Sequence, residues 1–150
     1  MERTLVLLKP DTVQRGLVGE LTSRLEARGL KIVALKMLRM DEDMANRHYD
    51  AHVGKGFFVG LVEFITSSPL IAMVWEGPNA VEMTRNTMGA TDPLVAAPGT
   101  IRGDLAISIG RNLIHGSDSL ESAQKEIQLF FSEGEVWEYD VDVGPWVIEP

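Results

Sequence analysis

The segment Asn112-Leu113-Ile114-His115-Gly116-Ser117-Asp118 places a histidine after an apolar dipeptide and directly before a glycine and a helix-start signal. An imidazole is largely neutral, and therefore nucleophilic, near neutral pH without special activation. A neighbouring carboxylate can fix which ring nitrogen carries the proton and leave the other nitrogen free to attack. His115 is therefore a candidate nucleophile, although an isolated histidine is more often structural.

A set of basic and hydroxyl side chains lies in loops or at the ends of expected elements, where substrates usually bind. Guanidinium groups bind phosphate oxygens through two parallel hydrogen bonds, which favours a polyphosphate ligand. The candidates are Lys9, Arg85, Thr91 and Arg102. The chain has neither the P-loop motif nor the Gly-x-Gly-x-x-Gly motif, so side chains rather than a glycine-rich loop would hold the phosphates.

Hydrophobic periodicity predicts strands and helices in alternation around these residues. The predicted strands are Arg3–Leu8, Leu30–Met40, Ile71–Glu76 and a short one in the histidine segment. The predicted helices are Gly16–Arg28, one that begins at Asp41–Asp43, Phe57–Thr66, Ala80–Thr87 and one after Asp118. Residues 88–110 show no periodicity, and so long a loop in a compact domain is usually functional. We therefore expect a long ordered loop before His115.

The last predicted helix should begin with a capping box formed by Asp118 and Glu121. Its buried stripe should contain Leu120, Ala123, Ile127, Phe130 and Phe131. The order of elements predicts an α/β sandwich, with a single sheet covered by helices on one main face.

Composition narrows the class of protein. The 150 residues suit one domain, and the absence of cysteine excludes disulfides and a thiolate nucleophile. Residues 1–116 carry 13 acidic and 13 basic side chains, whereas residues 117–150 carry 9 acidic side chains and one basic, which accounts for the net charge of −8. An anionic substrate should therefore meet the first three-quarters of the chain. The sequence has no basic stripe of the kind that binds nucleic acid, so we expect no nucleic-acid partner. It shows no long apolar run and no signal peptide, so we expect a cytoplasmic protein without a membrane partner.

Taken together, these segments resemble the nucleoside diphosphate kinase family from Arg3 to Trp146. The similar segments are Lys9-Pro10-Asp11, Gln14-Arg15-Gly16-Leu17, His48-Tyr49, Phe57-Phe58, Met73-Val74-Trp75-Glu76-Gly77, Pro98-Gly99-Thr100-Ile101-Arg102-Gly103-Asp104 and Asn112 to Asp118. The resemblance implies a single domain over residues 1–150, with a ferredoxin-like four-stranded antiparallel sheet and helices packed on it. It also implies transfer of the γ-phosphate of a nucleoside triphosphate to a nucleoside diphosphate by a ping-pong mechanism.

The resemblance implies a role for each matching position. His115 corresponds to the phosphorylated histidine, Ser117 and Glu126 to the pair that orients its imidazole, and Tyr49 to the tyrosine beside it. Lys9 and Asn112 correspond to the residues that reach the ribose hydroxyls. The positions implied to bind phosphate are Arg85, Thr91 and Arg102, and the position implied to stack on the base is Phe57.

The resemblance further implies Mg²⁺, held mainly by nucleotide phosphates and water, and a homo-oligomer for which a hexamer is favoured and a tetramer remains open. Pro93 lies in the loop that family members use at a trimer contact. The tail residues Trp146 and Val147 are apolar enough to dock on a neighbouring chain, and all three tryptophans are expected to be packing residues.

Two other interpretations remain open at this stage. One is a non-catalytic ferredoxin-like module that binds nucleotide or RNA, and the other is an oligomer with a vestigial site. The presence of both His115 and Glu126 counts against the first. His48 and His52 are interpreted as structural or surface residues, without a second ligand at metal-binding spacing.

Overall fold

A computed structural model describes residues 1–150. Its four strands form one sheet in the order β2-β3-β1-β4, and every neighbouring pair is antiparallel. The strands are β1 (Glu2–Leu8), β2 (Lys31–Leu38), β3 (Leu70–Gly77) and β4 (Ile114–Gly116). This is the ferredoxin-like antiparallel sheet that the resemblance implies.

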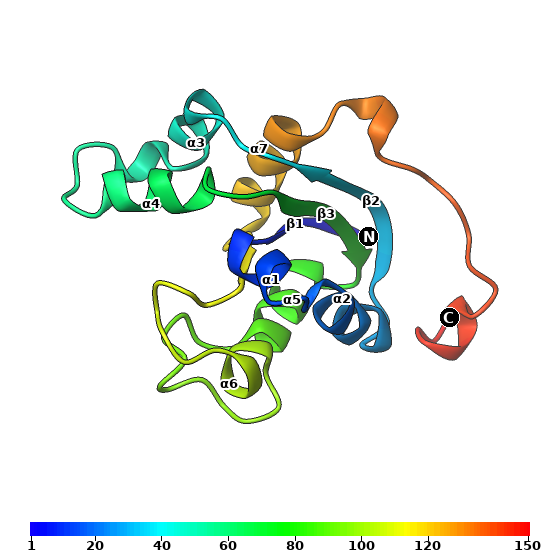
Figure 1. The fold of residues 1–150 in the computed structure, drawn as a ribbon. Coiled ribbons are helices and arrows are strands. Elements are labelled where there is room, and N and C mark those ends of the chain that lie inside the picture. The colour runs from blue at the N-terminus through cyan, green and yellow to red at the C-terminus, as the bar shows by residue number, and fades with distance from the viewer.

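The helices cover both faces of the sheet, as Figure 1 shows. One face carries α1 (Pro10–Gln14), α2 (Val18–Ala27), α5 (Ala80–Met88) and α6 (Ile101–Leu105). The other face carries α3 (Glu42–His48), α4 (Phe58–Ile65) and α7 (Leu120–Phe130), with short 3₁₀ turns at Asp50–His52, Glu133–Glu135 and Gly144–Trp146. The predicted helices at Gly16–Arg28, Phe57–Thr66 and Ala80–Thr87 are thus confirmed within a few residues.

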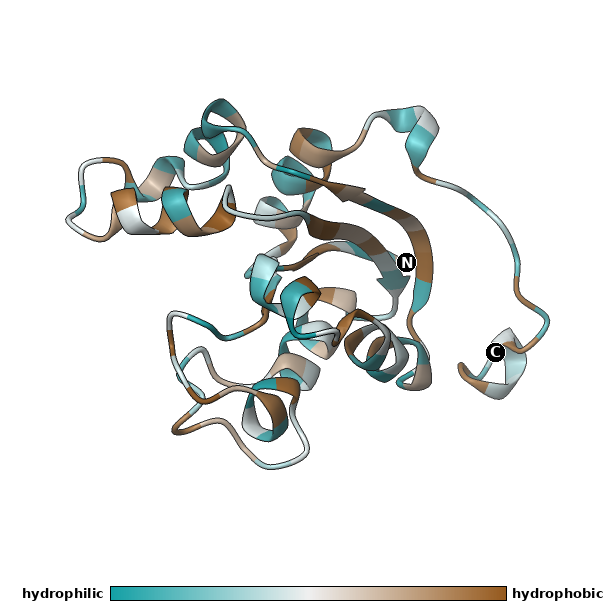
Figure 2. Ribbon diagram, in the orientation of Figure 1, coloured by the Kyte–Doolittle hydropathy of each residue, from teal (hydrophilic) through white to brown (hydrophobic).

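The expectation of one main covered face was wrong, because the central strands are apolar on both sides. Thr4–Leu8 of β1 and Leu70–Trp75 of β3 are buried without interruption, and Figure 2 shows hydrophobic residues over much of these central strands. Leu5 and Leu7 enter the core under α3, α4 and α7, whereas Val6 and Leu8 enter the core under α2 and α5. In the sequence, a strand that is buried on both faces appears as a run of apolar residues and not as an alternation of apolar and polar residues.

The orientation of the histidine segment follows from the way in which β4 pairs with β1. His115 pairs with Leu7 of β1, while its neighbours Ile114 and Gly116 pair with Leu8 and Val6. Directly opposed residues of an antiparallel pair point to the same face, and successive residues point to opposite faces. His115 therefore lies on the α3, α4 and α7 side of the sheet.

Two local expectations require correction. The aperiodic stretch 88–110 contains the helix α6, capped by Thr100, whose hydroxyl accepts the amide of Gly103 at 3.0 Å. A five-residue helix is too short to leave a periodic pattern. The helix α7 is capped by Ser119, which accepts the amide of Ser122 at 3.0 Å, one residue later than the predicted box at Asp118.

The exposed apolar residues correct the remaining packing expectations. Leu120, the first residue of α7, is exposed rather than part of the buried stripe. Trp75 is fully buried as expected, but Trp137 and Trp146 are exposed within this chain. No helix is long and apolar enough to span a membrane.

Candidate active site

A hydrogen bond joins His115 to α7. Nε2 of the imidazole lies 2.6 Å from Oε2 of Glu126. Burial disfavours the Glu126 carboxylate, but the hydrogen bond from His115 and nearby groups including Ser117 outweigh it, so the pKa of Glu126 falls below its usual value. An ionised carboxylate only accepts hydrogen bonds, so Nε2 must donate and Nδ1 carries the lone pair.

The backbone immediately before His115 is held in an unusual conformation. Leu113 has a φ of +75°, which non-glycine residues seldom adopt. The buried Asp11 carboxylate accepts the Leu113 amide at 2.9 Å, and the hydroxyl of Thr12 donates to the Leu113 carbonyl at 2.6 Å. Strained conformations persist where surrounding contacts determine them, and they cluster at functional sites. Asp11 and Thr12 are positioning residues that the sequence analysis did not identify.

Gly116 allows α5 to approach β4 closely. A Cβ atom at this position would lie 2.5 Å from Sδ of the buried Met88 and 3.3 Å from Cγ2 of Thr84. The close packing of α5 against β4 therefore explains why a glycine follows His115. On the other side of β4, Ser117 is buried and its hydroxyl accepts the Leu5 amide at 3.3 Å. Ser117 thus ties the strand end to β1 and lies close enough to Glu126 to affect its pKa.

Lys9 and Asn112 form a hydrogen-bonded chain across the site. Nζ of Lys9 donates to Oδ1 of Asn112 at 2.5 Å, and Nδ2 of Asn112 donates to the Thr91 carbonyl at 2.9 Å. Burial is the main cause that lowers the pKa of Lys9 to about 8, with Arg102 and Arg111 adding to it and Asp11 opposing it. The structure therefore brings together three residues that the sequence analysis placed at the substrate, with Thr91 joined through its backbone.

The two predicted phosphate-binding arginines differ in environment. Arg102 is buried, and its guanidinium donates to the carbonyls of Asn112 (3.2 Å), Gly89 (3.1 Å) and Ile114 (2.5 Å). A guanidinium has five N–H groups, so two remain for a ligand. Burial, followed by the charge of Arg85, lowers the pKa of Arg102 to about 10. Arg85 is exposed on α5 and donates to the Gly116 carbonyl at 3.3 Å.

Two aromatic candidates lie on the α3 and α4 side. Phe57 immediately precedes α4 and its side chain is exposed, whereas the adjacent Phe58 is half-buried. An exposed aromatic face is available for stacking. Tyr49 ends α3 and is half-buried; burial, helped by Glu126, raises its pKa to about 12.

His48 is buried, which is compatible with its interpretation as a structural residue, but it lies directly beside His115. Only 2% of its side chain is exposed, its ring meets the His115 ring edge-on at 4.8 Å, and its Nδ1 lies 3.6 Å from Oε2 of Glu126. Burial, followed by the charge of His115, lowers the pKa of His48 to about 3. The signal that could have found it is its position directly before Tyr49, on the same last turn of α3.

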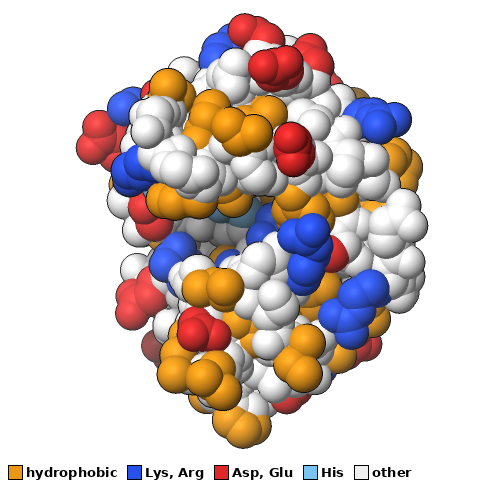
Figure 3. Space-filling model, turned by 60° about the vertical axis from the view of Figure 1, so that its left-hand side comes forward, with side chains coloured by type: hydrophobic (Ala, Val, Ile, Leu, Met, Phe, Trp, Pro, Cys, Tyr) orange, Lys and Arg blue, Asp and Glu red, His pale blue; other side chains and the backbone are white.

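The surface of the molecule is hollowed by a cleft (Figure 3). Figure 3 shows a hollow between two lobes, with a histidine on its floor and Lys or Arg side chains along its rim. Of all His, Asp and Glu side chains, those of His48, His115 and Glu126 form the one cluster of three whose donor atoms converge within 4.8 Å. Two imidazoles and one carboxylate are not the all-oxygen set that Mg²⁺ favours.

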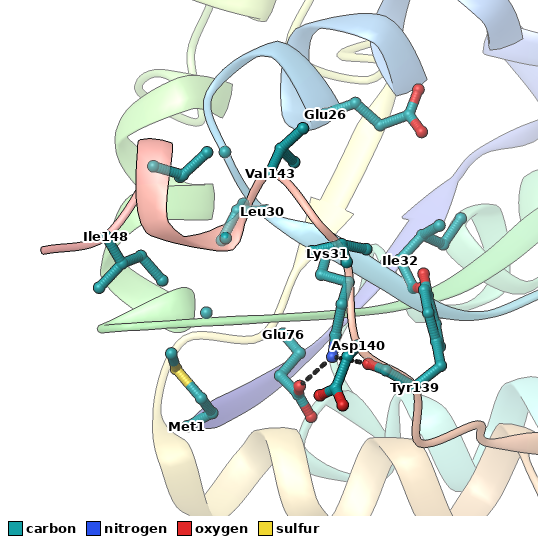
Figure 4. A pocket seen from close by; sticks show the side chains of 15 residues that line it. Met1, Glu26, Leu30, Lys31, Ile32, Glu76, Tyr139, Asp140, Val143 and Ile148 are labelled. Carbon is teal, nitrogen blue, oxygen red and sulfur yellow. Dashed lines mark hydrogen bonds and ion pairs between the residues drawn. The ribbon is translucent and has the colours of Figure 1, made fainter. Parts of the chain in front are cut away.

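A separate cavity of about 640 Å³ lies between the C-terminal tail and the turn from α2 to β2. Figure 4 shows Lys31 at its centre, bonded to the Tyr139 carbonyl at 2.6 Å and paired with Glu76 at 3.1 Å. Val147 closes it against Gly29. None of the predicted site residues lines this cavity, so it is distinct from the cleft.

Comparisons with known proteins show which family the chain belongs to. Residues 2–136 match the family model described as nucleoside diphosphate kinase. The chain is 61% identical to a nucleoside diphosphate kinase of Pelotomaculum thermopropionicum, over 99% of this chain and 100% of the relative. It is 53% identical to a nucleoside diphosphate kinase of Synechocystis sp., with the same coverage.

Solved structures give the same result. A halophilic nucleoside diphosphate kinase from Halobacterium salinarum, solved in complex with CDP, superposes with a TM-score of 0.96 at 53% identity and covers 99% of each chain. A nucleoside diphosphate kinase family protein from Babesia bovis also gives 0.96, at 42% identity, over 99% of this chain and 100% of its own. The chain therefore belongs to the nucleoside diphosphate kinase family, enzymes that transfer phosphate between nucleotides.

Proposed function

We propose that this enzyme transfers the γ-phosphate of a nucleoside triphosphate to a nucleoside diphosphate through a phosphohistidine at Nδ1 of His115. The observation that carries the proposal is the 2.6 Å hydrogen bond between Nε2 and Glu126, because it directs the lone pair to Nδ1. The side chain of His115 is 30% exposed, so a phosphate can approach it from the cleft. The non-catalytic module considered from the sequence alone gives no reason for this arrangement.

The cationic groups would neutralise the phosphate as it passes to His115. Phosphoryl transfer depends mainly on positioning and on neutralisation of charge at the phosphate oxygens. Lys9, Arg85 and the two remaining N–H groups of Arg102 would supply that charge. Thr91 would add a hydroxyl contact from the loop before α6.

The nucleoside would extend from the phosphates towards α4. Asn112 and Lys9 would reach the ribose hydroxyls, and the exposed ring of Phe57 would stack on the base. Because every base has a π-face, one stacking contact tolerates all bases. Tyr49 and Ser117 would support His115 and Glu126 from either side.

Members of this family require a divalent cation. We assign Mg²⁺ to the substrate, since Mg²⁺ commonly keeps several waters and binds through nucleotide phosphates. The ion would supply additional charge neutralisation on the phosphates, and no side-chain cage of this chain is needed to hold it.

We further propose a cytoplasmic homo-oligomer, with a hexamer favoured over a tetramer. Support comes from exposed apolar residues outside the cleft, among them Leu35 and Met37 on the edge strand β2 and Leu94 and Val95 beside Pro93. Pro93 itself is buried within the chain, so its neighbours rather than its own ring would meet a partner.

The direct test is incubation with ATP labelled on the γ-phosphate and Mg²⁺, followed by a chase with GDP. We expect an acid-labile label on the protein that discharges into GTP. The His115→Gln variant, checked for folding by circular dichroism, should take up no label. An acid-stable label, or a label that GDP does not remove, would contradict the proposal.

A further inference from the structure

Three elements bring metal-binding side chains together, and one of these side chains is the nucleophile His115. His48 comes from the end of α3, His115 from β4 and Glu126 from the middle of α7. One donor atom from each residue lies within 4.8 Å of the other two. The shortest separation is 2.6 Å, from Nε2 of His115 to Oε2 of Glu126, and Nδ1 of His48 lies 3.6 Å from the same oxygen.

Two atoms of this cluster are buried without a hydrogen-bond partner. They are Nδ1 of His48 and Oε1 of Glu126. The His48 side chain is 98% buried, being only 2% exposed, and its Nδ1 faces the other two donors. Most buried polar atoms in proteins are satisfied, so two unpartnered atoms in one cluster are available to bind a ligand.

The chemistry of the donors indicates which ligand. Two imidazoles and one carboxylate form the ligand set of many zinc sites, in which a fourth position stays open. Tetrahedral bonds of 2.0–2.2 Å place the ligand atoms about 3.3 Å apart. The cluster brackets this value, with its shortest separation below it and its longest above it, so side-chain shifts of about 1 Å would form the site.

We propose that His48, His115 and Glu126 form a binding site for Zn²⁺, and that the bound ion prevents His115 from acting as the nucleophile. A neutral imidazole holds one proton. The metal can bind Nε2 only when the proton that Nε2 donates to Glu126 has moved to Nδ1, where it occupies the lone pair that attacks phosphate. The ion also replaces the hydrogen bond between His115 and Glu126.

The site is accessible from the cleft. The side chains of His115 and Glu126 are 30% and 15% exposed, and His48 closes the back of the cluster. The inhibitory consequence rests on the proposed function, whereas metal binding itself does not.

The binding test uses the full chain with ZnCl₂ alone, free of nucleotide, in equilibrium dialysis and in competition with a chromogenic chelator. We expect one Zn²⁺ per chain, and an affinity at least about tenfold weaker in His48→Phe, because one of three ligands is lost. His52→Gln removes the one histidine outside the cluster and should bind as wild type does. Glu126→Gln provides a second variant should His48→Phe unfold.

Co²⁺ gives a spectroscopic readout independent of activity. Wild type and His52→Gln should show the intense visible bands of a four-coordinate ion, and His48→Phe should not. Failure of wild type to bind stoichiometric Zn²⁺, or equal affinity in wild type, His48→Phe and Glu126→Gln, would overturn the site.

Inhibition is tested by adding Zn²⁺ before labelled ATP. We expect less phosphohistidine, with recovery after a chelator removes the metal. Undiminished labelling of the zinc-bound protein would overturn the inhibitory role, and absent labelling without zinc would instead refute the proposed function.

Discussion

At the level of single residues, reactivity depends on which nitrogen of His115 holds the proton. Glu126 accepts from Nε2, and its lowered pKa keeps it able to do so. The neighbouring His48 is neutral, so it adds no positive charge that would compete for this carboxylate. The reactive tautomer is therefore set by one carboxylate on α7.

Replacing Glu126 by glutamine should mainly lower kcat. The amide can present either an oxygen or an NH₂ group to Nε2, so the tautomer is no longer fixed, and we expect a loss of about 10²-fold or more. The KM for nucleotide should change much less, because Glu126 lies behind the imidazole. Steady-state kinetics with varied nucleoside diphosphate measure both, and a kcat within twofold of wild type would contradict this role.

Lys9 should impose an alkaline limit on activity. Its pKa is lowered to about 8, chiefly by burial, so the ammonium form is present below that pH and is lost above it. A neutral amine attracts phosphate less, and kcat/KM should therefore decline as the pH rises past about 8. In Lys9→Met this decline should be absent, whereas the exposed Lys125→Met should retain the wild-type profile. The pH range from about 7 to about 9 lies on both sides of this pKa, and a wild-type kcat/KM that stays constant over it would contradict the prediction.

At the level of secondary structure, the conformation before His115 depends on α1. The buried Asp11 carboxylate and Thr12 hold Leu113 at its positive φ, so a motif near the N-terminus positions a nucleophile about a hundred residues later. The packing of Gly116 against Met88 adds a constraint from α5. The catalytic strand is thus held from both ends.

Asp11→Asn should weaken this arrangement. A hydrogen bond to a buried charged group contributes about 1.5–3 kcal/mol, and we expect a loss of folding free energy of that order together with reduced activity. Denaturant unfolding measures the first and the phosphotransfer assay the second. Asp142→Asn, on the exposed tail, serves as the matched control, and an Asp11 variant as stable as that control would refute the role.

The helix α6 and the loop that precedes it offer a second test at this level. A Cβ on Gly103 would lie 2.0 Å from the carbonyl oxygen of Ala97, an atom that cannot move without the backbone. Gly103→Ala should therefore destabilise the protein by about 1–3 kcal/mol and displace Arg102. Gly110→Ala has open space around its Cβ and should be tolerated. Equal stability of the two variants would show that the loop adapts.

The longer amphipathic helices α2, α4, α5 and α7 and the apolar strands β1, β2 and β3 could be predicted from sequence, because each is long enough to show its period or its apolar run. The helix α6 could not be predicted, because a five-residue helix is too short to show a period. The presence of helices on both faces of the sheet could not be predicted either, because strands buried on both faces lose the alternation of apolar and polar residues. In the site, residue types alone indicated Lys9, Arg102 and His115. Their contact partners, among them Asp11 and His48, depend on long-range geometry that no local pattern encodes.

At the level of the whole molecule, charge is unevenly distributed along the chain. The cationic residues that we assign to the cleft belong to residues 1–116, whereas the acidic excess belongs to residues 117–150. The tail runs along β2, where Trp137 donates its amide to the Val33 carbonyl at 2.8 Å, and then leaves Trp146 exposed. The surface of β2 that carries the exposed Leu35 and Met37 lies at the sheet edge opposite β4, away from His115.

This surface should mediate self-association. Leu35 and Met37 lie two residues apart on the edge strand β2 and are 53% and 58% exposed, beyond the point where the tail bonds to Val33. Exposed apolar edges are normally covered or blocked in a stable protein. The double variant Leu35→Glu, Met37→Glu should therefore yield a smaller particle than wild type by light scattering. Val59→Glu, at a similarly exposed apolar residue on α4, should leave the mass unchanged. If the double variant keeps the wild-type mass, or if wild type is monomeric, β2 is not the interface and the apolar loop around Leu94 and Val95 becomes the surface to test.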